Sequence, residues 1–176
     1  PYMEAAQREG KKKGPDPQRR LLATWRAMLD RAAAMRGGGP LVIGGKSMGG
    51  RMASMLLAAG DAPEAMGAVY LGYPLHPPGK PEKLRADHLA DVPVPQLFVQ
   101  GAKDKLCDPA RLRPVLRKLK DADPRLRVVL TGCSVRADNQ KALAKRYPAV
   151  DLFLRPDEEP ELTSRLGIAG PTTPEA

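Results

Sequence analysis

The chain has 176 residues, a hydrophobic fraction of 42% and a net charge of +9. That length suits one α/β domain with its own core and is too short for two large domains. No apolar run could cross a bilayer and no export signal is present, so we expect a cytoplasmic protein without a membrane partner. Aromatic residues make up only 4% and the basic residues are dispersed, which favours a solvated basic surface over a nucleic-acid interface.

The two cysteines, Cys107 and Cys133, are too few and too far apart to form a disulfide framework or a closed zinc site. We expect both thiols to be reduced, and the residues by themselves indicate no metal and no cofactor. Because the first residue is Pro1 rather than methionine, we also expect the chain to be a fragment of a longer protein. The sequence carries no signature of an oligomeric state.

The predicted elements alternate between helix and strand after a polar N-terminal loop that ends at Pro15. Asp16 is placed to cap a helix that starts at Pro17, and the glycines at 37–39 end that helix. Later helices are expected over residues 48–59, up to His88, over 109–120 after an Asp108 cap, over 137–146, and before Gly167. Strands are expected over residues 41–43, 68–71, 96–99, 126–130 and 150–154.

This alternation of short apolar strands with helices predicts an α/β protein. A mostly parallel sheet covered on both faces, in a three-layer α/β/α arrangement, is the architecture that such a pattern indicates. The last residues, 171–176, are expected to form a disordered tail.

The segment Gly45-Lys46-Ser47-Met48-Gly49 fits the pattern G-x-S-x-G and lies between a predicted strand and a predicted helix. In a nucleophile elbow this setting lifts the serine hydroxyl above the sheet edge, and glycines flank it because side chains there would collide with the strand and helix. We therefore predict Ser47 as a nucleophile, with the backbone N–H of Met48 as an oxyanion donor. The alternative is a glycine-rich turn that binds an anion or packs tightly.

An acidic residue follows the strand predicted at 96–99. Asp104 comes after a glycine turn at the end of that strand, which is where a carboxylate that orients a catalytic base is expected. The alternative is an ordinary solvated aspartate between Lys103 and Lys105.

Two longer segments, residues 43–54 and 72–81, together with the turn at 101–104, resemble one branch of the α/β hydrolases. This branch is the dienelactone-hydrolase-like group that also contains the KANL/Tex hydrolase-like proteins. The resemblance covers about residues 1–118 and implies a partial α/β-hydrolase fold. It further implies a small acyl substrate, with Ser47 as the nucleophile and Asp104 as the acid.

The histidine that completes the triad is missing from its place. In this fold the order is Ser, Asp, His, yet His76 and His88 both precede Asp104, and we expect them to be loop or surface residues. Where relatives carry a Gly-x-Asp-His-Ser turn, this chain has residues 131–136, Thr-Gly-Cys-Ser-Val-Arg. The first oxyanion turn of the family would precede Pro1. We therefore expect a serine-hydrolase scaffold that is inactive as this chain.

The C-terminal part resembles a different family. Residues 127–133, 147–154 and 158–162 are similar to the N-terminal domain of radical-SAM tRNA methylthiotransferases, where three cysteines hold an auxiliary [4Fe–4S] cluster. Cys133 matches the last of these cysteines, and the other two are absent. Cys133 would be a cluster ligand only if the chain were a fragment of such an enzyme.

The two resemblances divide the chain into a hydrolase-like core at 1–118 and a βαβα segment at 119–170. We hypothesise that they were joined in a chimeric reading frame or recombinant fragment. Three functions are therefore considered: a serine hydrolase scaffold for esters or dienelactones, a fragment of an iron–sulfur tRNA methylthiotransferase, and a basic module without catalysis.

Overall fold

The computed structural model describes residues 2–10, 14–101, 103–124, 126–132 and 135–167. The predicted tail at 171–176 and the candidate ligand Cys133 lie outside these ranges. In the described ranges, no helix combines the length and the apolar character needed to cross a membrane.

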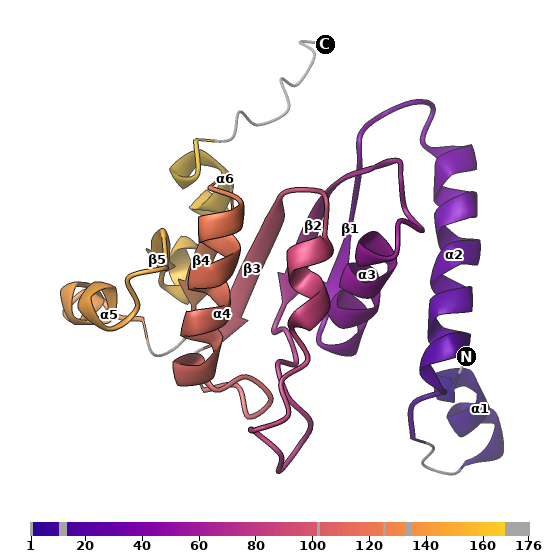
Figure 1. Cartoon of the computed structure of the whole chain (residues 1–176), viewed down its shortest axis with the longest axis horizontal. Coiled ribbons are helices and arrows are strands. Elements are labelled where there is room, and N and C mark those ends of the chain that lie inside the picture. The colour runs from indigo at the N-terminus through magenta and orange to yellow at the C-terminus, as the bar shows by residue number, and fades with distance from the viewer. Residues whose placement is uncertain (1, 11–13, 102, 125, 133–134, 168–176) are drawn as a thin grey trace.

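The centre of the fold is a parallel β-sheet, as the alternating pattern predicts. Its five strands, counted over the described residues, are β1 (Leu41–Lys46), β2 (Ala65–Leu71), β3 (Gln96–Gly101), β4 (Arg127–Thr131) and β5 (Leu152–Leu154). Every neighbouring pair is parallel, and the strands lie side by side in chain order. All the turns that leave the carboxyl ends of the strands therefore meet at one edge, which is the lower edge of the sheet in Figure 1.

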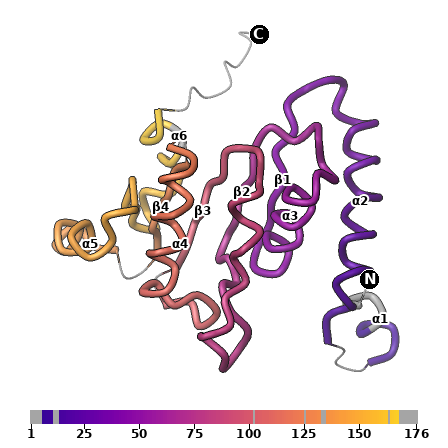
Figure 2. The backbone as a smooth tube through the Cα atoms, viewed as in Figure 1, coloured from indigo at the N-terminus to yellow at the C-terminus, as the bar shows by residue number. Residues whose placement is uncertain are grey.

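Helices cover the two faces of the sheet unequally. The helical elements are α1 (Tyr2–Glu9), α2 (Gln18–Met35), α3 (Met48–Ala58), η1 (Asp87–Asp91), α4 (Pro109–Ala122), α5 (Gln140–Arg146), η2 (Pro156–Glu161) and α6 (Leu162–Arg165). Figures 1 and 2 show α3 and α4 against the same face, with α2 beside α3 at the β1 end. On the opposite face, Thr131 of β4 donates a hydrogen bond to Glu159 of η2. The fold is thus a three-layer α/β/α arrangement.

The second helical layer is short, because η2 and α6 cover only the β4 end of the sheet. At the β1–β2 end of the same face, apolar side chains remain exposed to solvent: Val42 is 58% exposed and Leu71 is 44% exposed.

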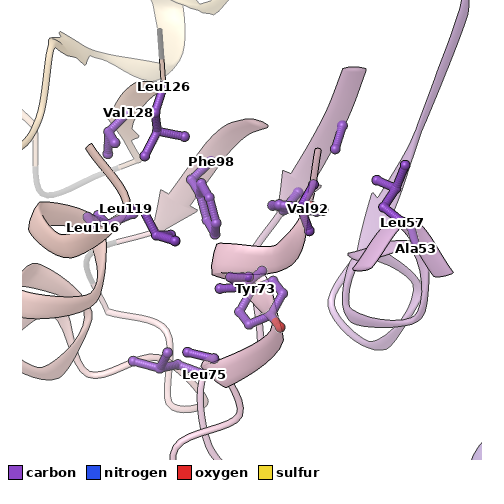
Figure 3. Close-up of a cluster of buried hydrophobic side chains, with 14 of the residues drawn as sticks. Ala53, Leu57, Tyr73, Leu75, Val92, Phe98, Leu116, Leu119, Leu126 and Val128 are labelled. Atoms are coloured by element: carbon purple, nitrogen blue, oxygen red, sulfur yellow. The ribbon is translucent and has the colours of Figure 1, made fainter. Parts of the chain in front are cut away.

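The main core lies between the sheet and the α3–α4 layer (Figure 3). Three rings, Tyr70, Tyr73 and Phe98, pack edge to face with centroids 4.8–5.8 Å apart. Figure 3 also shows Leu116 of α4 beside Val128 of β4, so side chains from both sides of residue 118 fill one core. The domain boundary proposed at residue 118 therefore does not fall at a gap in the packing, and it stays a prediction.

Three local predictions are wrong. Residues 2–9 form α1 rather than a loop, because the helix formers in this segment outweigh the nearby Gly10. Asp16 does not cap α2: the helix begins at Gln18 after Pro17, and Asp16 Oδ1 accepts a hydrogen bond from Arg20 instead. The helix expected before His88 is the short 3₁₀ turn η1.

Candidate functional site

Ser47 occupies a sharp turn between β1 and α3. Its backbone has φ 51° and ψ −120°, and no other non-glycine residue in the described ranges has a positive φ. Such a conformation costs an L-residue about 1–3 kcal/mol and persists only where the surroundings enforce it. The Ser47 N–H donates to the carbonyl of Leu71 at 2.8 Å, which ties the turn to the end of β2.

Glycines permit the close approach of β1 and α3 at this turn, but not all at the expected positions. A Cβ on Gly45 would lie 3.1 Å from the carbonyl carbon of Gly49, and a Cβ on Gly50 would lie 2.5 Å from the Gly45 carbonyl oxygen. A Cβ on Gly49 would meet nothing within 4 Å. The expected steric reason therefore holds for Gly45 and is wrong for Gly49, because the strand packs against the helix at Gly50.

Asp104 lies at the same edge of the sheet as Ser47. Gln100 donates to its Oδ2 at 2.9 Å, and the backbone N–H of Leu106 donates to its Oδ1 at 2.9 Å. A Cβ on Gly72 would lie 3.3 Å from Asp104 Oδ2. Since Ser47 bonds to Leu71 and Asp104 contacts the next residue, the two predicted site residues flank the end of β2.

A cavity of about 310 Å³ opens beside Ser47. The start of α2, the first turn of α3, the loop after β2 and the turn after β3 all contribute to its walls. Met48 also lines it, and as the first residue of α3 it has a backbone N–H without an acceptor inside the helix. The cavity thus brings the candidate hydroxyl and the candidate oxyanion donor to one solvent-accessible space.

Two arginines, Arg51 of α3 and Arg85 of the loop after β2, line the same cavity. Burial lowers the pKa of the Arg51 guanidinium, and the neighbouring positive charge of Arg85 lowers it further. Both effects disfavour the charged form, so the wall holds positive charge that the surroundings do not fully compensate. Neither arginine was identified from the sequence. Arg51 could have been, because it follows Ser47 by one helical turn.

His76 lies in the loop after β2, as expected, but its side chain is buried, and His88 is a half-buried residue of η1 rather than a surface residue. His76 is 5% exposed, and its Nε2 accepts a hydrogen bond from the Asp108 N–H. His88 is half-buried, and its Nε2 lies 2.8 Å from the hydroxyl of Ser54 and 3.4 Å from that of Tyr73. In the described ranges, no side chain is hydrogen-bonded to the hydroxyl of Ser47, so neither histidine acts on it in this arrangement.

The His88 contacts also organise the two arginines. Ser54 donates to the backbone carbonyl of Arg51 at 2.8 Å, and Tyr73 donates to that of Arg85 at 2.9 Å. Because each hydroxyl has one hydrogen and a carbonyl in reach, His88 Nε2 is best placed as the donor to Ser54. This buried polar cluster fixes the backbone at both arginines.

No group of three or more metal-ligating side chains exists among the residues that the structure describes. Cys107 is a free thiol with no exposed surface, and burial raises its pKa to about 12. A thiol in this state is a poor metal ligand, because the thiolate is the form that binds metals.

A comparison with known protein families identifies the family of this chain. A family described as alpha/beta hydrolase domain matches residues 1–128. The chain belongs to the alpha/beta hydrolase family. This membership agrees with the parallel sheet and accounts for a serine on a sharp strand-to-helix turn, which is the setting of the nucleophile in alpha/beta hydrolases.

Other comparisons are narrower. A stretch of 47 residues is 45% identical to a tRNA-2-methylthio-N(6)-dimethylallyladenosine synthase from Dehalococcoides mccartyi, and it covers 27% of this chain and 11% of that protein. The chain thus spans about a tenth of the curated relative, too little to carry that activity over to this alpha/beta hydrolase. No solved structure matches the chain.

Proposed function

We propose that this alpha/beta hydrolase is a serine-hydrolase scaffold for small acyl substrates, such as esters or dienelactones. The strained backbone of Ser47 supports this proposal most directly, because strain of this kind clusters at functional sites. In the proposed reaction the Ser47 oxygen bonds to the acyl carbon of an ester and its proton passes to solvent water. The bond to the alcohol then breaks, which leaves an acyl-serine that water hydrolyses. The N–H of Met48 stabilises the negative charge that develops on the carbonyl oxygen.

Asp104 is the proposed acid of the site. Its position beside the end of β2, held by Gln100 and Leu106, suits a carboxylate that orients a general base. The sequence has only two histidines, and both precede Asp104. The usual site of the base, after β4, includes residues outside the described ranges. Without a base, we propose that attack by Ser47 is slower by a factor on the order of thousands or more.

A phosphonate that reacts with activated serines tests the proposal. We expect a small alkyl fluorophosphonate to form one slow adduct, located on Ser47 by peptide mass spectrometry. The adduct should be absent from the S47A variant and unchanged in S164A, which removes an exposed hydroxyl on α6. Absence of an adduct on Ser47 after prolonged incubation, or equal labelling of S47A, would contradict the proposal.

A further inference from the structure

The cavity beside Ser47 contains positive charge for which the described residues supply no ion-pair partner. Among the described residues, Arg51 Nε is buried without a hydrogen-bond partner, and the guanidinium has one hydrogen bond, from a terminal nitrogen to the Gln18 side chain at 3.5 Å. In the described ranges no carboxylate forms an ion pair with Arg51 or Arg85. Several other arginines do pair with acids: Arg26 pairs with Asp61, for example.

Desolvation of an unsatisfied charged donor is costly. The Nε atoms of Arg113 and Arg155 are also buried without a hydrogen bond in the described ranges, but Arg155 pairs with Asp157 and Arg113 lies over the Tyr147 ring, whereas no such partner is found there for Arg51. Arg51 and Arg85 are also held near each other, since the Ser54–His88–Tyr73 cluster bonds to the backbone carbonyls of both. Two forked donors on the wall of one cavity match the oxygens of a carboxylate or phosphate.

One acid opposes this charge. Asp16 lines the cavity, its Oδ1 accepts a hydrogen bond from Arg20, and its buried Oδ2 has no hydrogen-bond partner within the described part of the chain. The cavity wall therefore carries two guanidinium groups against one carboxylate that is already paired with an exposed arginine. This excess of positive charge favours an anionic ligand. Removal of the Asp16 charge should therefore increase the affinity of the cavity for an anion.

We propose that Arg51 and Arg85 form a subsite for an anionic group, a carboxylate or a phosphate, on the molecule that enters the Ser47 cavity. The identity of that molecule as an acyl substrate rests on the proposed function, whereas anion binding by the two arginines does not. Because Ser47 lines the same cavity as the two arginines, the subsite selects acyl compounds that also carry a negatively charged group.

Binding measurements test the subsite without requiring catalysis. Monomethyl glutarate provides the carboxylate probe, butyl phosphate the phosphate probe, and methyl butyrate the neutral control; each is titrated into the full chain and followed by NMR chemical shifts. We expect both anions to bind and the neutral ester to bind at least about tenfold more weakly, since a charge-assisted hydrogen bond contributes this much. The anion that binds with the higher affinity shows whether the subsite prefers a carboxylate or a phosphate.

Matched variants locate the binding. R85Q removes a guanidinium that makes no hydrogen bond to any residue that the structure describes, and we expect it to weaken anion binding about tenfold or more. K83Q removes the same charge from an exposed position two residues away and should change binding less than about twofold. D16N removes the opposing carboxylate and should strengthen binding several-fold.

The anion subsite and the reaction at Ser47 are contradicted by different experimental results. Anion binding that persists in S47A, together with a missing Ser47 adduct, would retain the subsite and remove the hydrolase proposal. Anion binding that is equal in wild type, R85Q and K83Q would overturn the subsite, whatever happens at Ser47.

Discussion

The position of the Ser47 hydroxyl depends on a backbone contact that two glycines allow. Gly45 of β1 and Gly50 of α3 approach each other so closely that the Gly45 carbonyl oxygen would lie 2.5 Å from a Cβ on Gly50. This contact holds the strand against the first turn of the helix, and Ser47 lies between the two glycines. The strained φ of Ser47 follows from this short span.

Alanine substitutions at neighbouring glycines separate the close contact from ordinary helix propensity. We expect G50A to lower the free energy of unfolding by about 1–3 kcal/mol, because backbone atoms must move to accommodate the methyl group. G49A meets open space within α3 and should be neutral or stabilising by up to about 1 kcal/mol. Urea denaturation of both variants measures the difference. Equal destabilisation would contradict the proposed contact.

His88 gives the stability of the protein a pH dependence. Burial lowers its pKa below the ordinary value of 6.5, Arg51 lowers it further, and Asp87 and Asp91 oppose the shift. The unfolded chain therefore binds a proton at His88 more readily than the folded chain does. The free energy of unfolding should be highest above pH 6.5 and should fall as the pH drops through that value.

Urea denaturation at pH 7.5, 6.5 and 5.5 checks this expectation. In H88Q, the decrease of stability between the highest and lowest of these pH values should be smaller than in the wild type. A wild type whose stability does not change over this range, or an equal decrease in H88Q, would show that His88 is not held neutral in the folded state.

At the scale of elements, two Asp-Pro sequences that look alike behave differently. Asp108 caps α4, since its side chain accepts from the Ala110 N–H and Pro109 is the first helical residue. Asp16 precedes Pro17 in the same way, but its carboxylate turns to Arg20 and α2 begins one residue later. Whether the aspartate caps the helix depends on which hydrogen-bond donor its carboxylate can reach, and the Asp-Pro dipeptide does not reveal this.

The two aspartates give a matched pair of variants. D108A should lower the free energy of unfolding by about 0.5–2 kcal/mol through loss of the cap. D16A loses an ion pair with the exposed Arg20 and also removes a buried oxygen that has no hydrogen-bond partner among the described residues, so it should cost less than about 0.5 kcal/mol. Thermal or urea unfolding of both variants distinguishes the cases, and a larger loss in D16A would contradict the assignment of the caps.

Most regular elements could be predicted from the sequence, whereas helix α1 and the irregular loops could not. The five strands follow from short apolar runs bounded by glycine and proline, and Ser47 and Asp104 follow from their places at strand ends. The helix α1 was missed because a short segment without apolar periodicity is decided by propensity alone. Arg85 comes from the irregular loop after β2, whose path depends on bonds such as Tyr73 to the Arg85 carbonyl.

At the scale of the whole molecule, the two family resemblances meet inside a single packed structure. β3 and β4 pair over five positions, from Leu97 with Arg127 to Gly101 with Thr131. Leu126 and Val128 also enter the same core as Leu116 and Leu119 of α4. If the chain arose by fusion, the second part replaced a strand and its packing, rather than adding an independent domain.

A truncation tests whether the second part is needed for folding. A chain of residues 1–123 retains α4 but loses β4, so β3 becomes an edge strand and the apolar face of α4 loses its contacts with Leu126 and Val128. Each of those two side chains contributes about 1.5–3 kcal/mol when buried, which is a large part of the 5–15 kcal/mol that stabilises a typical domain. We therefore expect residues 1–123 to lack a cooperative urea transition and to expose apolar surface to a fluorescent dye.

A chain of residues 1–167 keeps every described element and should unfold as the full chain does. Cooperative unfolding of residues 1–123 at the midpoint of the full chain would instead show that the hydrolase-like part is an independent domain that ends near residue 118.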